Sequence, residues 1–104
     1  MKPAVDVVYR DLDSSASLNQ VIEKKLEKLN RYSNQILHSR VVLDTPHNHK
    51  HKGKHYRASI EIDIKGHPVA VTQDNESIHI AVRDAFISAE RKIKQITARQ
   101  RTIQ

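Results

Sequence analysis

Residues 56–64 have the sequence Tyr-Arg-Ala-Ser-Ile-Glu-Ile-Asp-Ile and give the strongest structural signal in the chain. Apolar and polar side chains alternate along the stretch. Because successive side chains of a β-strand point to opposite faces of the sheet, the pattern predicts a strand with one buried face and one solvent-exposed face. A sheet of this kind needs a second layer to cover its apolar face.

Three further strands are predicted around this one. Residues 4–10 are rich in β-branched side chains, and residues 36–45 continue as a strand until Pro46, which cannot donate a hydrogen bond to a sheet. The sequence Lys-Gly-His-Pro at residues 65–68 predicts a turn, and a short strand follows at residues 69–73.

Two segments have the periodicity of amphipathic helices. The first helix starts at either Ser15, as an N-cap, or Ser17, which forms a capping box with Gln20. Its apolar residues fall within about 140° of the helical wheel; they are Leu18, Val21, Ile22, Leu26, Leu29 and Tyr32. The second helix follows the acidic residues 74–77 and should fray after Ala98. Its apolar residues are Ile78, Val82, Ala85, Phe86, Ala89, Ile93 and Ile96.

The predicted order β-α-β-β-β-α is that of an α+β fold. A four-stranded sheet with one apolar face can cover both helices, which gives a two-layer sandwich with the two helices on one face. We expect residues 1–104 to form a single domain, with a His/Lys-rich loop at residues 46–55 and a short basic tail at residues 99–104.

Composition argues against most enzyme classes. The chain has no cysteine, and its two glycines, Gly53 and Gly66, cannot form a phosphate-binding glycine loop. The carboxylates are scattered, and the serines lie in cap or loop contexts. We therefore expect no enzyme activity, no cofactor and no small-molecule substrate. The chain also lacks an apolar run long enough for a signal peptide or a membrane span, so we expect a cytoplasmic protein.

The charge of the chain points to a polyanionic partner. Eighteen Lys and Arg residues against twelve Asp and Glu residues give a formal net charge of +6. Such an excess is typical of proteins that bind nucleic acid or an anionic membrane, although a basic protein without such a partner also fits. Aromatic residues are few, and the exposed positions Arg57, Glu61, Asp63 and Lys65 carry charges of both signs. Recognition through phosphates and shape, as for double-stranded RNA, is therefore favoured over base stacking.

Cations cluster on both predicted helices. Lys24, Lys28 and Arg31 have the spacing of one helical stripe, while Lys25 falls inside the apolar arc, where it either snorkels over the sheet edge or contacts a ligand. The second helix carries further candidates for RNA binding, which are Arg83, Arg91, Lys92 and Lys94. A salt-bridged, solvated face would give the same pattern. The isoleucines at positions 80 and 87 lie among these charges and could mark a protein contact.

The loop at residues 46–55 allows three interpretations. In an extended chain His47, His49 and His51 project on one side, as metal ligands would. Three lysines oppose a bound cation, and no carboxylate of the loop could complete the site; these lysines are Lys50, Lys52 and Lys54. A finger that contacts phosphates is therefore favoured over a metal site, and a solvated loop without a function is the third possibility.

Three segments together carry a resemblance to a known family. They are residues 22–29 leading to Tyr32, residues 82–86 leading to Arg91 and Lys92, and residues 40–54 with their Pro-His-x-His loop. In these segments, and in the order of its elements, the chain resembles the short form of the ribosome hibernation promoting factor family. That family is also called ribosome-associated inhibitor, factor Y or sigma-factor modulation protein.

The resemblance implies a double-stranded-RNA-binding-like fold and a function. Members of the family bind the small ribosomal subunit and its ribosomal RNA in the channel for mRNA and tRNA, and they inhibit translation in stationary phase or stress. Carried over, it implicates Lys25, Lys28, Arg91 and Lys92 in RNA contacts. We expect a protein that is a monomer when not bound to the ribosome. The alternative is a general structured-RNA-binding or protein-binding regulator.

The sequence departs from the family in two places. Typical members have a glycine just after the first strand, where this chain has Tyr-Arg-Asp at residues 9–11. The His/Lys-rich loop is also longer than in short members. The chain ends soon after the second helix, and we therefore expect no pairing of ribosomes through the C-terminal dimerisation domain of the long form.

The histidines predict a pH dependence. Four of the seven histidines lie in residues 47–55, and protonation would add positive charge near phosphates. Ribosome binding should therefore be at least as strong at about pH 6 as at about pH 8. Replacing His47, His49 and His51 with glutamine should flatten this dependence in a co-sedimentation assay without unfolding the domain. Micromolar zinc or nickel binding by calorimetry, with a pH-independent ribosome affinity, would support the metal site instead.

Overall fold

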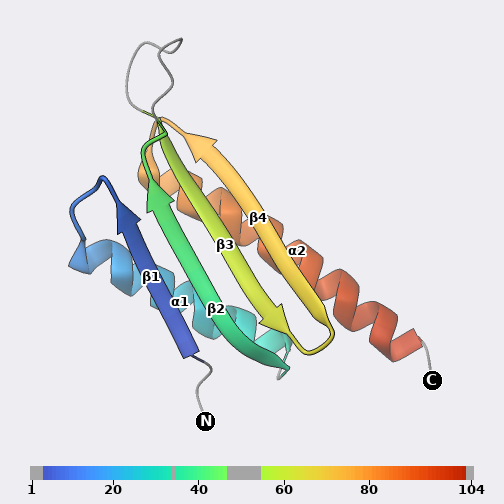
Figure 1. Cartoon of the computed structure of the whole chain (residues 1–104). Coiled ribbons are helices and arrows are strands. Elements are labelled where there is room, and N and C mark those ends of the chain that lie inside the picture. Colours follow the sequence, from blue (N-terminus) through green and yellow to red (C-terminus); the bar gives the residue numbers. More distant parts are fainter. Residues whose placement is uncertain (1–3, 34, 47–54, 103–104) are drawn as a thin grey trace.

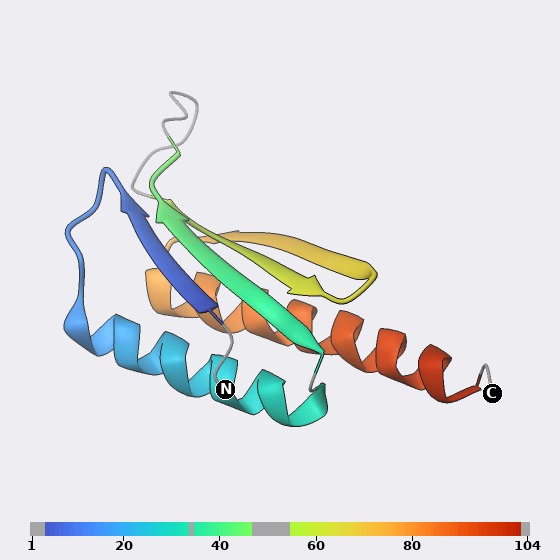
Figure 2. The ribbon, with the colours of Figure 1, turned by 60° about the horizontal axis from the view of Figure 1, so that its bottom comes forward.

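A computed structural model describes residues 4–33, 35–46 and 55–102 (Figure 1). Its elements are β1 (Ala4–Arg10), α1 (Ala16–Tyr32), β2 (Ile36–Asp44), β3 (Tyr56–Ile64), β4 (His67–Asn75) and α2 (Ile78–Thr102). The strands form one sheet in the order β1-β2-β3-β4, in which β1 is parallel to β2 and the other pairs are antiparallel. Both helices cover the same face of this sheet, so the predicted two-layer α+β sandwich is confirmed (Figure 2).

The core lies between the sheet and the helices. The alternation predicted for residues 56–64 is present in β3, where Ala58, Ile60, Ile62 and Ile64 are buried and face the helices. Ala58, Ile60 and Ile62 are each paired with a buried or partly buried residue of β2 and β4 on the same face, whereas Ile64 is paired with the buried Ile36 of β2 and the exposed His67 of β4. The helices contribute the other half of the core; their fully or nearly fully buried side chains are Leu18, Ile22, Leu26, Leu29, Ala81, Val82, Ala85, Phe86, Ala89 and Ile93.

The start of α1 is fixed by side-chain hydrogen bonds. Ser15 is the N-cap, because its hydroxyl accepts a hydrogen bond from the backbone N–H of Leu18 at 3.2 Å. The hydroxyl of Tyr9 donates to Oδ1 of Asn19 at 2.7 Å and ties β1 to this first turn. Between strand and helix, Asp11 has a φ of 56°. Aspartate tolerates this left-handed conformation better than most residues, and so it does here what the glycine expected at this connection would do.

Two elements are longer than the sequence predicted. Strand β4 spans His67–Asn75 because the turn uses only Lys65 and Gly66, whose φ of 81° suits glycine. Pro68 fits inside β4 because this strand is at the edge of the sheet and its missing N–H leaves no gap in the pairing. Helix α2 continues past Ala98 to Thr102, since neither glycine nor proline interrupts it. Part of the expected basic tail is therefore helical.

The two helices are linked by a small charged cluster. The Glu90 carboxylate lies 3.7 Å from Lys28 Nζ of α1 and 3.5 Å from Lys94 Nζ of α2. The Lys94 ammonium lies 4.7 Å from the centroid of the Tyr32 ring. A hydrogen bond from the Tyr32 hydroxyl and the two lysine charges lower the pKa of Glu90, against the opposing effect of burial. We call these four side chains the helix-linking cluster.

Two isoleucines of α2 test the core assignment with the same substitution. Ile93 is fully buried, whereas Ile87 is 47% exposed. Ile93→Ala should lower the free energy of unfolding by about 2–5 kcal/mol, because it removes buried methyl groups and leaves a cavity. Ile87→Ala should cost less than about 1 kcal/mol. Urea denaturation of both variants measures the difference, and equal losses would contradict the packing of α2 described above.

The helix-linking cluster predicts a pH-dependent stability. The pKa of Glu90 in the folded chain lies below its ordinary value of 4.5, so its ionised form stabilises the fold above that pH. Glu90→Gln should lower the free energy of unfolding at neutral pH by about 1 kcal/mol. The deficit should shrink as the pH falls below 4.5, because the wild-type carboxyl then becomes protonated.

Glu27→Gln is the matched control for this measurement, since Glu27 is exposed. Thermal denaturation of both variants across this pH range separates the two residues. A deficit of Glu90→Gln that persists unchanged at low pH would show that Glu90 does not act through its charge.

Candidate nucleic-acid interface

The outer face of the sheet is acidic and internally paired. Opposite charges face each other across neighbouring strands, for example Asp6, Arg40 and Glu61 in one row across β1, β2 and β3. Arg57 Nε donates to Asp74 Oδ1 at 3.0 Å, and this hydrogen bond raises the pKa of the guanidinium. Among the described residues this face carries five carboxylates and three guanidinium groups; they are Asp6, Asp44, Glu61, Asp63, Asp74, Arg10, Arg40 and Arg57. Such a surface repels phosphates.

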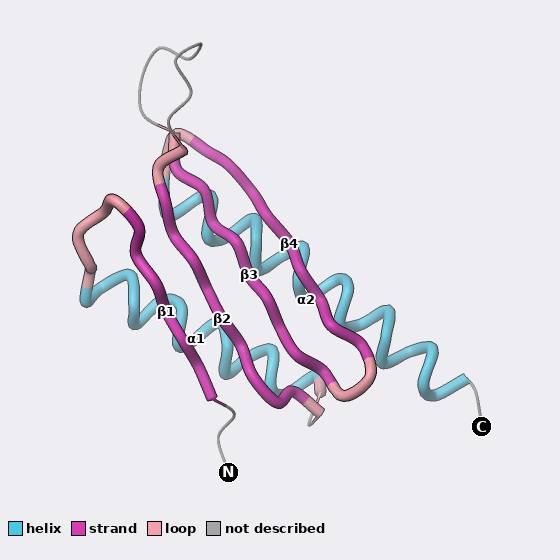
Figure 3. Tube along the Cα trace, in the orientation of Figure 1, coloured by secondary structure: helices cyan, strands magenta, loops and turns pink. Residues whose placement is uncertain are grey.

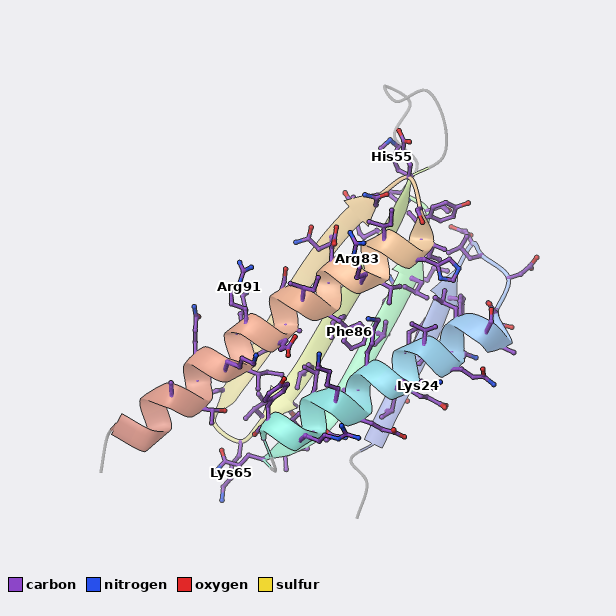
Figure 4. All side chains as sticks on the ribbon, turned by 180° about the vertical axis from the view of Figure 1, so that it is seen from behind. Lys24, His55, Lys65, Arg83, Phe86 and Arg91 are labelled. Atoms are coloured by element: carbon purple, nitrogen blue, oxygen red, sulfur yellow. The ribbon has the colours of Figure 1, made fainter. Side chains whose placement is uncertain are left out.

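The helical face has the opposite balance. The described side chains of α1 and α2 include eight Lys and Arg residues and four carboxylates. The eight cations are the candidates that the sequence placed on the helices: Lys24, Lys25, Lys28, Arg31, Arg83, Arg91, Lys92 and Lys94. The helices lie side by side over the sheet, with Lys24 on α1 and Arg83 and Arg91 on α2 (Figure 4). The net positive charge of the described side chains is therefore on the helical side.

Several of these cations meet between the helices. Lys25, Lys28 and Arg83 line a groove of about 80 Å³ whose floor includes Leu29 and Phe86. Lys25 is half-buried there. This partial burial agrees with its position inside the apolar arc. The side chain lies on the side of α1 that faces α2, whereas the sequence had also allowed a position over the sheet edge. The exposed Ile87 and the Glu90 carboxylate complete the lining of this groove.

Lys92 does not share this surface. Its Nζ donates to the backbone carbonyl of Ala70 in β4 at 3.1 Å, so it lies on the side of α2 that faces the edge of the sheet. Residues 92 and 94 are about 160° apart on a helical wheel, which explains why Lys94 reaches Tyr32 while Lys92 turns away. The candidates Arg91, Lys92 and Lys94 are therefore divided between three sides of the helix, with Arg91 pointing outward (Figure 4).

The sequence analysis did not identify the role of Glu90 or Tyr32. The sequence pattern places Tyr32 on the apolar stripe of the first helix and in the family resemblance, and it assigns no role to Glu90. A helical wheel could have shown that both lie at the margins of their apolar stripes, but the pairing of the two margins depends on how the helices pack.

The His/Lys-rich loop is not part of the described structure. Its candidate phosphate contacts Lys50, Lys52 and Lys54 and the alternative metal ligands His47, His49 and His51 lie outside the described residues. Within residues 4–33, 35–46 and 55–102, no group of three or more His, Asp or Glu side chains is placed to hold a metal ion. No helix in the same ranges is long and apolar enough to span a membrane.

Two solved structures have the same fold as this chain. The crystal structure of the Thermus thermophilus Protein Y N-terminal domain matches with a TM-score of 0.77 and 26% sequence identity, covering 91% of this chain and 99% of that one. A ribosomal subunit interface protein from Coxiella burnetii matches with a TM-score of 0.74 and 14% identity, covering 91% of this chain and 98% of that one, and at this identity it shows the fold alone.

The comparison with curated proteins gives no match. The comparison with protein families matches residues 5–101, which is nearly the whole chain, and so confirms the resemblance predicted from the sequence. This chain belongs to the family described as "Sigma 54 modulation protein / S30EA ribosomal protein".

Proposed function

We propose that this chain is a non-enzymatic ribosome-binding protein that occupies the mRNA and tRNA channel of the small subunit and inhibits translation under stress or in stationary phase. The description of its family names a modulation protein and a ribosomal protein, and neither name refers to a chemical reaction. One similar structure is a Protein Y domain, and another is a ribosomal subunit interface protein. The proposal places the protein in the cytoplasm, as a monomer without a cofactor when it is not bound to the ribosome.

The observation that carries the proposal is the unequal charge of the two faces. Without Lys92, which turns to the sheet edge, the helices carry seven cations to four acids and attract the phosphates of ribosomal RNA. The sheet face, with five acids to three guanidinium groups, does not. The chain therefore has one side on which it can approach RNA. Lys24, Arg31 and Arg91 are exposed on that side.

The groove between the helices brings cations of α1 and α2 together on this face. Side-chain exposures of 59% for Lys28 and 55% for Lys94 leave both ammonium groups accessible to an RNA phosphate while Glu90 keeps them close together. Lys25 and Arg83 border the same groove. A phosphate backbone that follows the groove would meet cations from both helices, so that recognition depends on the spacing of the helices as well as on charge.

A charge reversal on each face tests the proposal. Lys24→Glu with Arg31→Glu changes the helical face, and Arg10→Glu with Lys65→Glu makes the same change of charge on the sheet side. The first pair should weaken co-sedimentation with small subunits by orders of magnitude and reduce the log–log salt slope by about 2, at roughly 0.9 per lost phosphate contact. The second pair should have a much smaller effect.

Inhibition of translation in a cell-free system is the second measurement for both pairs, and circular dichroism confirms folding. Equal weakening by the two pairs would mean that only net charge matters. Retained binding by the helical-face pair would rule out the helical face as the RNA-binding surface. Binding to structured RNA without any preference for small subunits would favour the general RNA-binding alternative.

A further inference from the structure

A second groove lies on the side of α1 that is turned away from α2. It has a volume of about 580 Å³ and lies between β1 and α1. Val5, Val7 and Leu26 form its apolar part, and Val5 is 42% exposed. Polar side chains of α1 form its rim, and they are Asn19, Glu23, Glu27 and Asn30. These positions share one side of the helix, which is turned away from the lysines that border α2.

Strand β1 borders this groove and is an open edge of the sheet. It pairs only with β2, and half of the backbone groups of an edge strand point away from its neighbour (Figure 3). The other edge is protected differently, since β4 contains Pro68 and its Ala70 carbonyl accepts a hydrogen bond from Lys92. Among the described residues, no comparable side chain covers the backbone of β1.

The rim of the groove is acidic in a chain with a net charge of +6. Glu23 and Glu27 lie one helical turn apart, where two like charges destabilise a helix. Within the described parts of the chain, neither carboxylate lies within 4.0 Å of a Lys, Arg or His nitrogen. This repulsion between the two carboxylates does not stabilise the fold, and a cationic group bound in the groove would reduce it. The rim also repels RNA, which separates the groove from the helical face.

We propose that this groove binds a basic, extended peptide segment of another protein, which adds to the sheet as a strand beside β1. The backbone of the segment would pair with the open edge, as in other cases of strand addition. Its alternate side chains would enter the groove about 6.6–6.8 Å apart, close to the roughly 6 Å rise between Glu23 and Glu27. Lysine or arginine at these positions places an aliphatic stem on Val5 and Leu26 and a cationic head at the two carboxylates.

The experiment uses the whole chain and a fluorescently labelled eight-residue peptide of alternating arginine and valine. Binding is followed by fluorescence anisotropy. A peptide of the same composition with four arginines followed by four valines controls for attraction by charge alone. The alternating peptide should bind at least tenfold more tightly than the block peptide. Equal affinities would overturn the proposal.

Two variants of equal charge change locate the site. Glu23→Gln with Glu27→Gln should reduce the affinity for the alternating peptide at least tenfold. Glu61→Gln with Asp63→Asn removes two exposed carboxylates from the outer face of the sheet and should change the affinity less than twofold. All four substitutions are on exposed side chains, and circular dichroism checks that both variants fold. An equal loss in the two variants would overturn the proposal.

Backbone methylation of the peptide tests the strand addition itself. Two peptides carry N-methyl groups on alternate residues, one set on the even and one on the odd positions. Only one set can face β1, so one peptide should lose binding and the other should keep it. Equal behaviour of the two peptides would contradict the proposal. Concentration-dependent dimerisation that Glu23→Gln with Glu27→Gln abolishes would assign the groove to a second copy of this chain instead.

Discussion

The sheet has a single apolar face, and both helices must cover it. This constraint follows from the alternation in β2 and β3, whose inward residues are almost fully buried and whose outward residues are, apart from Val42, mainly charged or polar. With both helices on one side, the outer face of the sheet is left to water, and opposite charges on neighbouring strands pair there. Among the described residues, cations outnumber acids on the helices and not on the sheet.

The helix-linking cluster joins the structural role of this face to its binding role. The Glu90 carboxylate lies 3.7 Å from Lys28 Nζ and 3.5 Å from Lys94 Nζ. Its negative charge keeps near each other two cations that would otherwise repel. Tyr32 shields one side of the cluster and hydrogen-bonds the carboxyl. The arrangement costs little desolvation because both lysines remain more than half exposed. A polyanion thus meets cations whose spacing is set before binding.

Local patterns predicted most of the fold, because each element carries its own signal. The alternation in residues 56–64, the apolar stripes of the helices and the stop at Pro46 all correspond to elements of the structure. Element ends were less predictable. The extension of α2 to Thr102 depends on the absence of a stop signal, and the tolerance of Pro68 depends on β4 being at the edge. The departure of Lys92 from the other cations could not be predicted from charge spacing, because it follows from the position of β4 beside α2.

The two edges of the sheet differ in a way that bears on aggregation. Continuous growth of β-structure between identical chains requires every copy to offer two free edges, so that each added copy presents a new template. In this chain β4 carries Pro68 within its span, and Lys92 occupies its Ala70 carbonyl. Pairing through β1 therefore presents a poorer template for the next addition, because the partner's other edge lacks the N–H of Pro68 and has its Ala70 carbonyl occupied. The protein can keep an open edge for binding without becoming the repeating unit of a fibre.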